Sequence, residues 1–218
     1  CINYFKEIMN QKNGKNSLGI DICFEDLNNP IDLFKKWFSK AEESEINDPN
    51  AVAVATSNKN NQPNVRMVLL KGLSDKGFVF YTNFNSRKGS ELKENQKASM
   101  CFHWKSLRRQ VRVIGKVEEV SSKEADDYFN TRPYKNRIGA WASSQSKVLD
   151  KRETFLKNIK EFENKFPDQA NVPRPPHWSG WRLLPDEIEF WLDGDGRIHE
   201  RLNYKKKSSK WEKELLYP

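Results

Sequence analysis

The sequence of 218 residues has little that would indicate a disulfide framework, a metal site or a membrane span. Its three cysteines, Cys1, Cys23 and Cys101, are odd in number and lack the paired spacing of zinc ligands. We therefore expect no metal and no disulfides, and a reducing cytoplasm is the simplest location. No apolar run approaches the ~20 residues that cross a bilayer, and no secretory signal is visible, so no membrane association is expected.

The short motifs of several enzyme classes are also missing. Neither a G-x-x-x-x-G-K-[ST] nor a G-x-G-x-x-G phosphate loop occurs, and there is no G-x-S-x-G nucleophile elbow. The histidines His103, His177 and His199 are far apart in the chain. Nucleotide folds built on those loops, hydrolases of the elbow type and zinc sites made of clustered histidines are therefore disfavoured.

Positive charge and aromatic side chains are what the sequence does have. Lys and Arg number 38 against 30 Asp and Glu, a net charge of +8, which suits nucleic acid, anionic membranes or phosphorylated small molecules as partners. The cations are scattered, and the single run Lys205–Lys207 is read as a solvated loop rather than a nucleic-acid patch. Seven Trp and thirteen Phe can furnish a core although only 36% of the residues are hydrophobic.

Apolar periodicity and turn residues predict one mixed domain over residues 30–218, after a flexible N-terminal segment over 1–29. Short antiparallel strands closed by Asn, Gly, Asp and Pro favour a barrel or sandwich with flanking helices over a βαβ sheet. Helices are expected at 30–45, 86–95, 121–132 and 150–166, and a proline-rich linker at 167–176. Strands are expected at 51–56, 65–71, 78–82, 97–104, 109–120, 181–184, 187–191 and 197–204, with a last segment near Trp211.

Two groups of basic residues lie on or beside the first predicted strands. Alternation along a strand places Arg66, Val68 and Leu70 on one face, and edge solubility accounts for such charges as well as ligand binding does. The stretch Ser86-Arg87-Lys88-Gly89 places two cations at a helix N-terminus, where free backbone N–H groups favour an anion. A plain helix cap with solvated cations explains this stretch equally well.

Two more groups occur later in the chain. If 197–204 is a strand, Arg197, His199 and Arg201 share one face, and their charges repel unless solvent or an anion lies between them. Tyr128 and Arg132 lie four apart on a predicted helix, as a phosphate pair or as a structural contact. Each group therefore keeps a structural and a ligand-binding interpretation.

Taken together, the motifs resemble those of the pyridoxamine 5'-phosphate oxidase family. The order and spacing hold from about residue 30 to the C-terminus. The matching stretches are R-M-V-L-L-K (66–71), Y-T-N (81–83), S-R-K-G (86–89), R-R-Q-V-R-V (108–113), Y-F-N-T-R-P (128–133), I-G-A-W-A-S-S-Q-S (138–146), P-x-x-W-x-G (175–180), I-E-F-W (188–191) and R-I-H-E-R (197–201).

The resemblance implies an α+β, mainly β, antiparallel split β-barrel of Greek-key type that binds FMN and works as a homodimer, with FMN at the subunit interface. It implies oxidation of pyridoxamine 5'-phosphate and pyridoxine 5'-phosphate to pyridoxal 5'-phosphate, with oxygen as acceptor. Residues carried over as FMN contacts are Arg66, Met67, Val68, Leu69, Leu70, Lys71, Tyr81, Thr82, Arg87, Lys88, Gln110, Gln145, Ser146, Trp191 and Arg201. Those carried over for the substrate phosphate are Lys71, Tyr128, Arg132 and Asn136, with Arg197 and His199 as catalytic residues at the substrate ring.

The chain departs from the family pattern at Asn136, where Ser is usual, at Leu192 and at Glu214. Two other function classes stay open, namely a flavin split-barrel reductase for a different substrate and a non-catalytic flavin- or nucleic-acid-binding module. The predicted second phosphate pocket at Tyr128 and Arg132 argues against the reductase. An RNA-binding module would carry aromatic stacking motifs on its strands, and none is found.

Overall fold

The computed structural model describes residues 14–218, so Cys1 lies outside the described residues. The chain forms two compact units. Unit 1 comprises Cys1–Pro49, Cys101–Val113 and Asp186–Pro218, and unit 2 comprises Asn50–Met100 and Ile114–Pro185. The prediction of one domain from residue 30 onwards stays a prediction, and each unit is described by itself.

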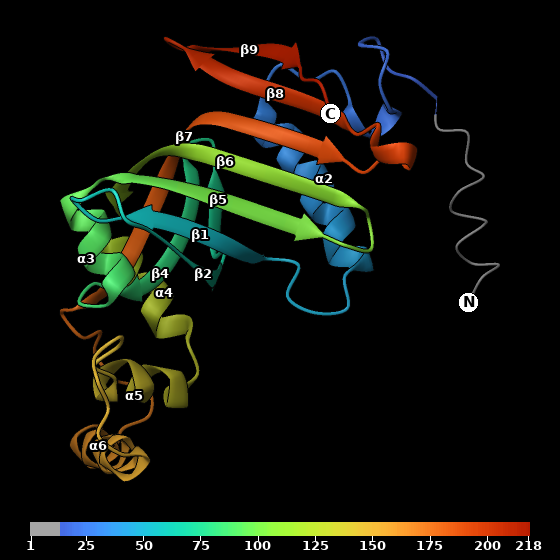
Figure 1. Cartoon of the computed structure of the whole chain (residues 1–218). Helices are drawn as coiled ribbons and strands as arrows, with labels where there is room; N and C mark the ends of the chain where they lie inside the picture. The colour runs from blue at the N-terminus through green and yellow to red at the C-terminus, as the bar shows by residue number, and fades with distance from the viewer. Residues whose placement is uncertain (1–13) are drawn as a thin grey trace. The chain divides into compact units, whose positions relative to one another are not determined.

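The helices and strands follow one another as labelled in Figure 1. They are η1 (Ile22–Phe24), α2 (Pro30–Ser44), β1 (Ala51–Ser57), β2 (Pro63–Leu69), β3 (Gly72–Ser74), β4 (Gly77–Asn83), α3 (Arg87–Glu94), β5 (Lys97–Trp104), β6 (Arg109–Glu119), α4 (Ser122–Thr131), α5 (Tyr134–Ala142), α6 (Arg152–Lys165), β7 (Trp178–Leu192), η2 (Asp195–Arg197), β8 (Glu200–Lys207) and β9 (Lys210–Leu215). The strands are hydrogen-bonded in the order β2-β1-β5-β6-β7-β4-β3, with β8 on β7 and β9 on β8. Strands that follow one another in the chain pair antiparallel, as the turn residues between them predict.

In unit 1, helix α2 has the amphipathic character expected of residues 30–45. Asn29 caps it by accepting from the Ile31 N–H at 3.0 Å, and Pro30 occupies the first turn, where a missing N–H costs nothing. Its buried stripe includes Phe34, whose ring lies 5.0 Å from that of Phe102, and Trp37. The predicted aromatic stripe is therefore core, as expected.

In unit 2, strand β2 alternates as the sequence predicts. Its residues are exposed and half-buried in turn, with Arg66 and Val68 on the half-buried side and Val65 and Met67 68% and 63% exposed. Among the described strands β2 has only β1 as a hydrogen-bonded neighbour in the sheet order, in a register that places Arg66 opposite Val54. The other edge of β2 therefore leaves backbone donors and acceptors available.

The predicted pair of strands 181–184 and 187–191 is wrong, because β7 is one strand that runs through Pro185. Its backbone passes so close to two glycines that a Cβ at Gly77 would lie 2.0 Å from the Leu183 oxygen, and one at Gly115 1.9 Å from the Leu184 oxygen. Glycine at both neighbours lets the backbones approach here, so the proline does not end the strand.

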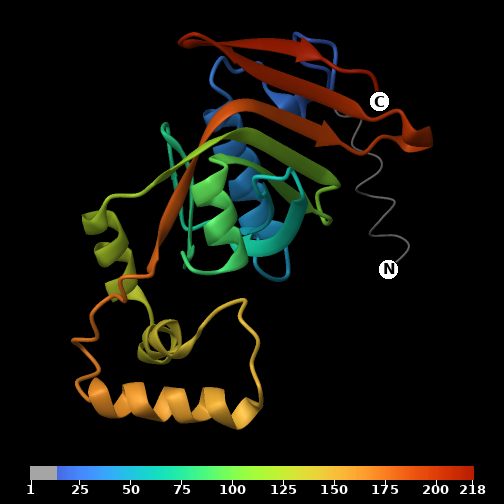
Figure 2. The ribbon, with the colours of Figure 1, turned by 60° about the vertical axis from the view of Figure 1, so that its left-hand side comes forward.

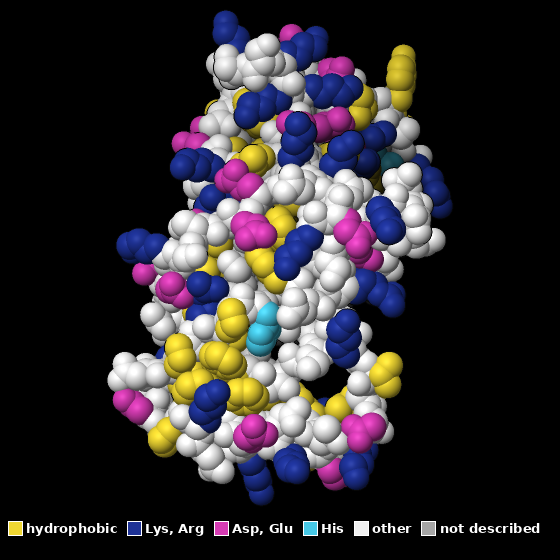
Figure 3. Space-filling view, turned by 90° about the vertical axis from the view of Figure 1, so that its left-hand side faces the viewer, with side chains coloured by type: hydrophobic (Ala, Val, Ile, Leu, Met, Phe, Trp, Pro, Cys, Tyr) yellow, Lys and Arg dark blue, Asp and Glu magenta, His cyan; other side chains and the backbone are white. Residues whose placement is uncertain are grey.

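Helix α5 was not expected after Pro133, which the sequence indicates only as the end of the helix before it. Pro133 in fact stands at the N-cap position of α5, where it has no N–H to lose. In unit 2, α5 and α6 contact each other, as Figure 2 shows, and Ile159 and Phe162 of α6 pack against the cluster that contains Ile138 and Trp178. Hydrophobic side chains gather over these helices in the lower part of Figure 3.

No helix among residues 14–218 is both long and apolar enough to cross a membrane.

Candidate active site

A cavity of about 550 Å³ lies in unit 2 and collects many of the predicted site residues. Its walls come from β2, β4, α3, the end of α4, α5 and the start of β7. It falls within the range of about 300–1,000 Å³ typical of small-molecule sites. The predicted residues that line it are Met67, Val68, Leu69, Lys71, Tyr81, Thr82, Lys88, Tyr128, Arg132, Asn136 and Gln145.

The charges of this cavity have one sign. Its lining includes Lys71, Lys88, Arg132 and Lys135, and no Asp or Glu. Four cations without a carboxylate would repel one another in a closed site unless an anion or solvent lies between them. The cavity therefore suits a ligand with phosphate groups.

One wall is aromatic and holds a buried guanidinium. The rings of Tyr81 and Tyr128 stack at 4.0 Å, and Trp178 lies nearly parallel to Tyr81 at 5.3 Å. Arg132 sits over the Trp178 ring at 4.7 Å, and its buried Nη1 has no hydrogen-bond partner among the described residues. Burial lowers the pKa of Arg132, yet arginine stays charged, so its guanidinium adds a positive charge to the cavity wall.

The prediction that Tyr128 and Arg132 share a helix is wrong, because α4 ends at Thr131 and Arg132 is already extended. Both nevertheless line the same cavity, as a phosphate pair would. Burial raises the pKa of Tyr81 to about 12 and also raises that of Tyr128. The two hydroxyls are therefore neutral near pH 7 and can donate to a ligand.

A polar chain joins α3 to the loop after α5. The Lys88 ammonium donates to Thr82 Oγ1 at 3.2 Å and to Gln145 Oε1 at 3.0 Å. Burial, together with the positive charge of Arg66, lowers the pKa of Lys88. Helix α3 starts as expected, since Ser86 Oγ accepts from the Gly89 N–H at 3.3 Å. Of the predicted anion site at residues 86–89, Lys88 lines the cavity.

Four predicted FMN contacts of unit 2, namely Arg66, Leu70, Arg87 and Ser146, do not line this cavity. Arg87 and Ser146 line a second cavity of about 530 Å³ in unit 2, and the Leu70 side chain is buried with 5% exposure. The Leu70 N–H donates to the Asn50 carbonyl at 2.8 Å, so neither its side chain nor its N–H is available to a ligand.

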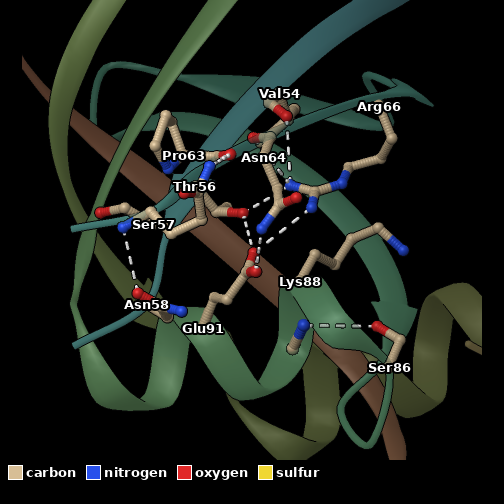
Figure 4. A network of polar contacts seen from close by, with 12 residues as sticks. Val54, Thr56, Ser57, Asn58, Pro63, Asn64, Arg66, Ser86, Lys88 and Glu91 are labelled. Atoms are coloured by element: carbon tan, nitrogen blue, oxygen red, sulfur yellow. Dashed lines mark hydrogen bonds and ion pairs between the residues drawn. The ribbon is translucent and has the colours of Figure 1, made fainter. Parts of the chain in front are cut away.

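Arg66 belongs to a polar network that sequence reasoning missed (Figure 4). Its guanidinium donates to Thr56 Oγ1 and lies 3.3 Å from Glu91 Oε2. Glu91 also accepts from the amide of Asn64. A Glu inside a short charged helix gives no sequence signal of burial, because its partners arrive from other strands.

The remaining predicted residues lie in unit 1. Arg201 Nε donates to Glu189 Oε1 at 2.8 Å, and Arg112 donates to the other oxygen of that buried carboxylate at 3.0 Å. The rings of Trp191 and His199 lie 4.6 Å apart. Gln110 is half-buried on β6.

The prediction that Arg197, His199 and Arg201 share a strand face is wrong at its start, because β8 begins at Glu200. Gly196 and Arg197 have φ values of 65° and 63°, which make a tight turn. Arg197 is exposed, and no described residue pairs with its guanidinium. Positive φ is uncommon for a residue other than glycine, asparagine or aspartate, so the turn holds the Arg197 backbone in a strained conformation.

His199 has a partner for Nδ1 in either charge state. Nδ1 lies 3.1 Å from Asp193 Oδ1 and 3.2 Å from the Gly194 N–H. A protonated Nδ1 donates to the carboxylate, and an unprotonated one accepts from the amide. Nδ1 is therefore paired in either tautomer, whereas Nε2 has no partner among the described residues.

The cavity also has lining residues that the sequence reasoning did not select, among them Lys135 and Trp178. Trp178 belongs to the P-x-x-W-x-G stretch, and its place in this family motif is the sequence signal that could have identified it. No group of three or more His, Cys, Asp or Glu side chains that could hold a metal ion is found among residues 14–218.

Two family models and two curated relatives that match this chain are described as pyridoxamine or pyridoxine 5'-phosphate oxidases. A family model described as pyridoxamine 5'-phosphate oxidase matches residues 38–166, and one described as the pyridoxine 5'-phosphate oxidase C-terminal dimerisation region matches residues 178–218. A pyridoxine/pyridoxamine 5'-phosphate oxidase from Pelagibacter ubique is 58% identical over 94% of this chain and 100% of that protein. One from Rhizobium etli is 53% identical over 89% of this chain and 95% of that protein.

Solved structures agree with the split-barrel fold. PhzG from Burkholderia lata, solved with tetrahydrophenazine-1-carboxylic acid, has a TM-score of 0.85 at 29% identity and covers 94% of this chain and 100% of its own. A pyridoxamine 5'-phosphate oxidase-related, FMN-binding protein from Nostoc punctiforme has a TM-score of 0.68 at 17% identity, over 85% of this chain and 96% of its own, and supports the fold alone. The fold class predicted from the motifs is confirmed, and the chain belongs to the pyridoxamine 5'-phosphate oxidase family.

Proposed function

We propose that this protein oxidises pyridoxamine 5'-phosphate and pyridoxine 5'-phosphate to pyridoxal 5'-phosphate, with FMN as cofactor and as a homodimer. The observation that carries this function is the cavity of unit 2, whose lining has four cations and no carboxylate. A substrate with a phosphate would offset that charge. The family match over residues 38–166 and 178–218 agrees with the same activity and with dimerisation.

The residues present fit FMN. The free edge of β2 offers backbone donors and acceptors to a flat polar ring, and Met67 and Leu69 offer apolar contact beside it. Lys88 provides positive charge at the cavity wall, and Arg66 provides positive charge beside α3, where it pairs with Glu91. These residues, with Arg87, would hold the FMN phosphate, while Tyr81, Thr82 and Gln145 would orient the cofactor. Bound FMN supplies a two-electron acceptor for a hydride from the substrate carbon and is reoxidised by oxygen, which gives hydrogen peroxide.

The substrate is held by its phosphate and oriented by its ring. Lys71, Tyr128, Arg132 and Asn136 bind the phosphate, and the aromatic wall excludes water from one side of the site. Arg197 contacts the pyridine ring with a planar guanidinium that nothing else in the described chain engages. His199 would orient the substrate through Nε2, which has no partner among the described residues, while Nδ1 lies 3.1 Å from Asp193 Oδ1. With Gln110, Trp191 and Arg201, these residues complete the site across the subunit interface.

Two measurements on the purified protein test this function. The protein should show a flavin absorption spectrum, or gain one on addition of FMN, and should form an aldehyde from pyridoxamine 5'-phosphate. Riboflavin should bind the apoprotein at least tenfold more weakly than FMN, because each charge-assisted phosphate contact contributes about 1.5–3 kcal/mol. Equal affinities would contradict the phosphate assignment, and flavin binding without aldehyde formation would favour a non-catalytic flavoprotein.

Asn136 departs from the family pattern and gives a finer test. It is exposed, lines the cavity, and can donate from its amide to the substrate phosphate. A neutral hydrogen bond contributes about 0.5–1.5 kcal/mol, so Asn136→Ala should raise the KM by up to about tenfold, with kcat nearly unchanged, and Asn136→Ser by only a few fold. Asn130→Ala, on the exposed side of α4, is the matched control. An unchanged KM in Asn136→Ala would mean that the pocket relies on Lys71, Tyr128 and Arg132.

A cytoplasmic location stays part of the proposal. It is supported by Cys23 and Cys101, which are free thiols among the described residues.

A further inference from the structure

Glu91 is a buried carboxylate that none of the roles above uses. It lies on α3, three residues after Lys88, and its side chain is 6% exposed. Its Oε1 accepts from the Asn64 amide, and its Oε2 accepts from the Thr56 hydroxyl and from Arg66 Nη2 at 3.3 Å. One carboxylate thus ties α3 to β1 and β2, and Figure 4 shows the three partners converging on it.

These contacts occupy one edge of the Arg66 guanidinium. Nη1 donates to the Thr56 hydroxyl and lies 3.3 Å from the Val54 carbonyl oxygen, while one Nη2 hydrogen points to Glu91. The Thr56 hydroxyl accepts from Arg66 and donates to Glu91, so it links the two charges. The Nε–H and the second Nη2–H form the other edge, and no described residue bonds them. Two parallel N–H groups are the geometry that grips a phosphate bidentately.

The charges of Arg66, Lys88 and Glu91 also interact. Arg66 and Lys88 repel each other, and the charge of Arg66 lowers the pKa of Lys88 whereas that of Glu91 raises it. Glu91 therefore offsets part of this repulsion and adds a charged partner to the hydrogen bond that Arg66 makes with Thr56. A carboxylate near a phosphate also opposes binding, but here hydrogen bonds to three neighbours offset its charge on the side away from the free edge.

We infer that Glu91 is a positioning residue for the cofactor: it holds Arg66 by one edge so that the other edge meets the FMN phosphate. This inference rests on the proposed role of Arg66 in FMN binding. Helix α3 would then contribute to FMN binding twice. Lys88 near its start lines the cavity, and Glu91 in its middle pairs with Arg66. The residue contacts neither substrate nor reacting atoms and acts only through Arg66.

The test compares FMN with riboflavin on the apoprotein, by quenching of flavin fluorescence, in Glu91→Gln, Arg66→Met and the double variant. Glu91→Gln keeps the size and removes the charge, and we expect it to weaken FMN about five- to thirtyfold and riboflavin less than about twofold. Arg66→Met should remove much of the preference for FMN. Glu91→Gln should then have no further effect in the Arg66→Met background, because it acts through that arginine.

Glu94→Gln is the matched control on the same helix, since the Glu94 carboxylate accepts from the Lys59 N–H at 3.2 Å and does not touch Arg66. If Glu91→Gln fails to fold, Thr56→Val, which removes the linking hydroxyl, should shift the FMN-to-riboflavin ratio in the same direction. Equal losses for both ligands, or tighter FMN binding, would overturn the positioning role. An unchanged ratio in Arg66→Met would instead overturn the role of Arg66 itself, and with it the inference.

Discussion

Replacing Arg132 with methionine should raise the KM for pyridoxamine 5'-phosphate by about ten- to a hundredfold, because a charge-assisted hydrogen bond contributes about 1.5–3 kcal/mol. The Arg132 guanidinium is stacked over Trp178, and its buried Nη1 has no partner in the described chain. Methionine preserves the apolar stem against the ring while removing the donors. The kcat should change little, since the phosphate contact is made equally in the ground state and the transition state. Steady-state kinetics over a range of substrate concentrations measure both constants.

The control for Arg132 also replaces a cation with methionine, at a residue that does not line the cavity. Lys157→Met lies on the exposed side of α6 and should leave both kinetic constants unchanged. Pyridoxamine without its phosphate should react poorly with the parent protein and hardly worse with Arg132→Met, because it lacks the group that Arg132 binds. Equal losses for the phosphorylated and unphosphorylated substrates would mean that Arg132 stabilises the aromatic wall and not the phosphate.

Arg197→Met should lower kcat/KM by well over tenfold, which corresponds to about 1.4 kcal/mol or more. The side chain stands on the turn before β8, exposed and without a partner in the described residues, so its planar donors are free for the substrate ring. FMN affinity should stay within about twofold, because the arginine is assigned to the substrate and not to the cofactor. Single-turnover reduction of the bound flavin, followed by its absorbance, separates the loss in chemistry from a loss in binding.

Arg197→Lys is the informative companion variant. It keeps the charge and loses the planar fork, so an activity between those of the parent and Arg197→Met would show that both contribute. Activity at the parent level in Arg197→Met would mean that this turn does not face the substrate. A parallel fall in FMN affinity would point to a disturbed turn, because Arg108 pairs with Asp193 and Asp195 beside it.

Local rules in the sequence predicted α2, the start of α3 and the alternation of β2 correctly. Asn29 and Ser86 are capping residues, Pro30 fits only a first turn, and the apolar spacing of Phe34 and Trp37 is helical. Each of these signals depends on neighbours within a few residues. The family and the proposed set of site residues came from motif order, which is also a property of the chain alone.

Long-range contacts account for the errors. The continuity of β7 through Pro185 depends on Gly77 and Gly115, which are distant in the chain. The sequence between Gly194 and Arg201 reads as a strand, yet the positive φ values at Gly196 and Arg197 shorten it to β8. The alternation of apolar and polar residues gives no signal for this tight turn, because the ion pairs of Arg108 with Asp193 and Asp195 beside it join distant parts of the chain.

By itself, then, the sequence determined which side chains are present, which elements carry most of them, and which family they belong to. The tertiary structure decided which donors stay unsatisfied and which charges meet. The Arg132 guanidinium lines the cavity and packs on Trp178, which comes from a separate element. Glu91 becomes buried because the register of β1 and β2 brings Thr56 and Arg66 to α3. Burial and pairing depend on atoms from separate strands, and no local pattern encodes them.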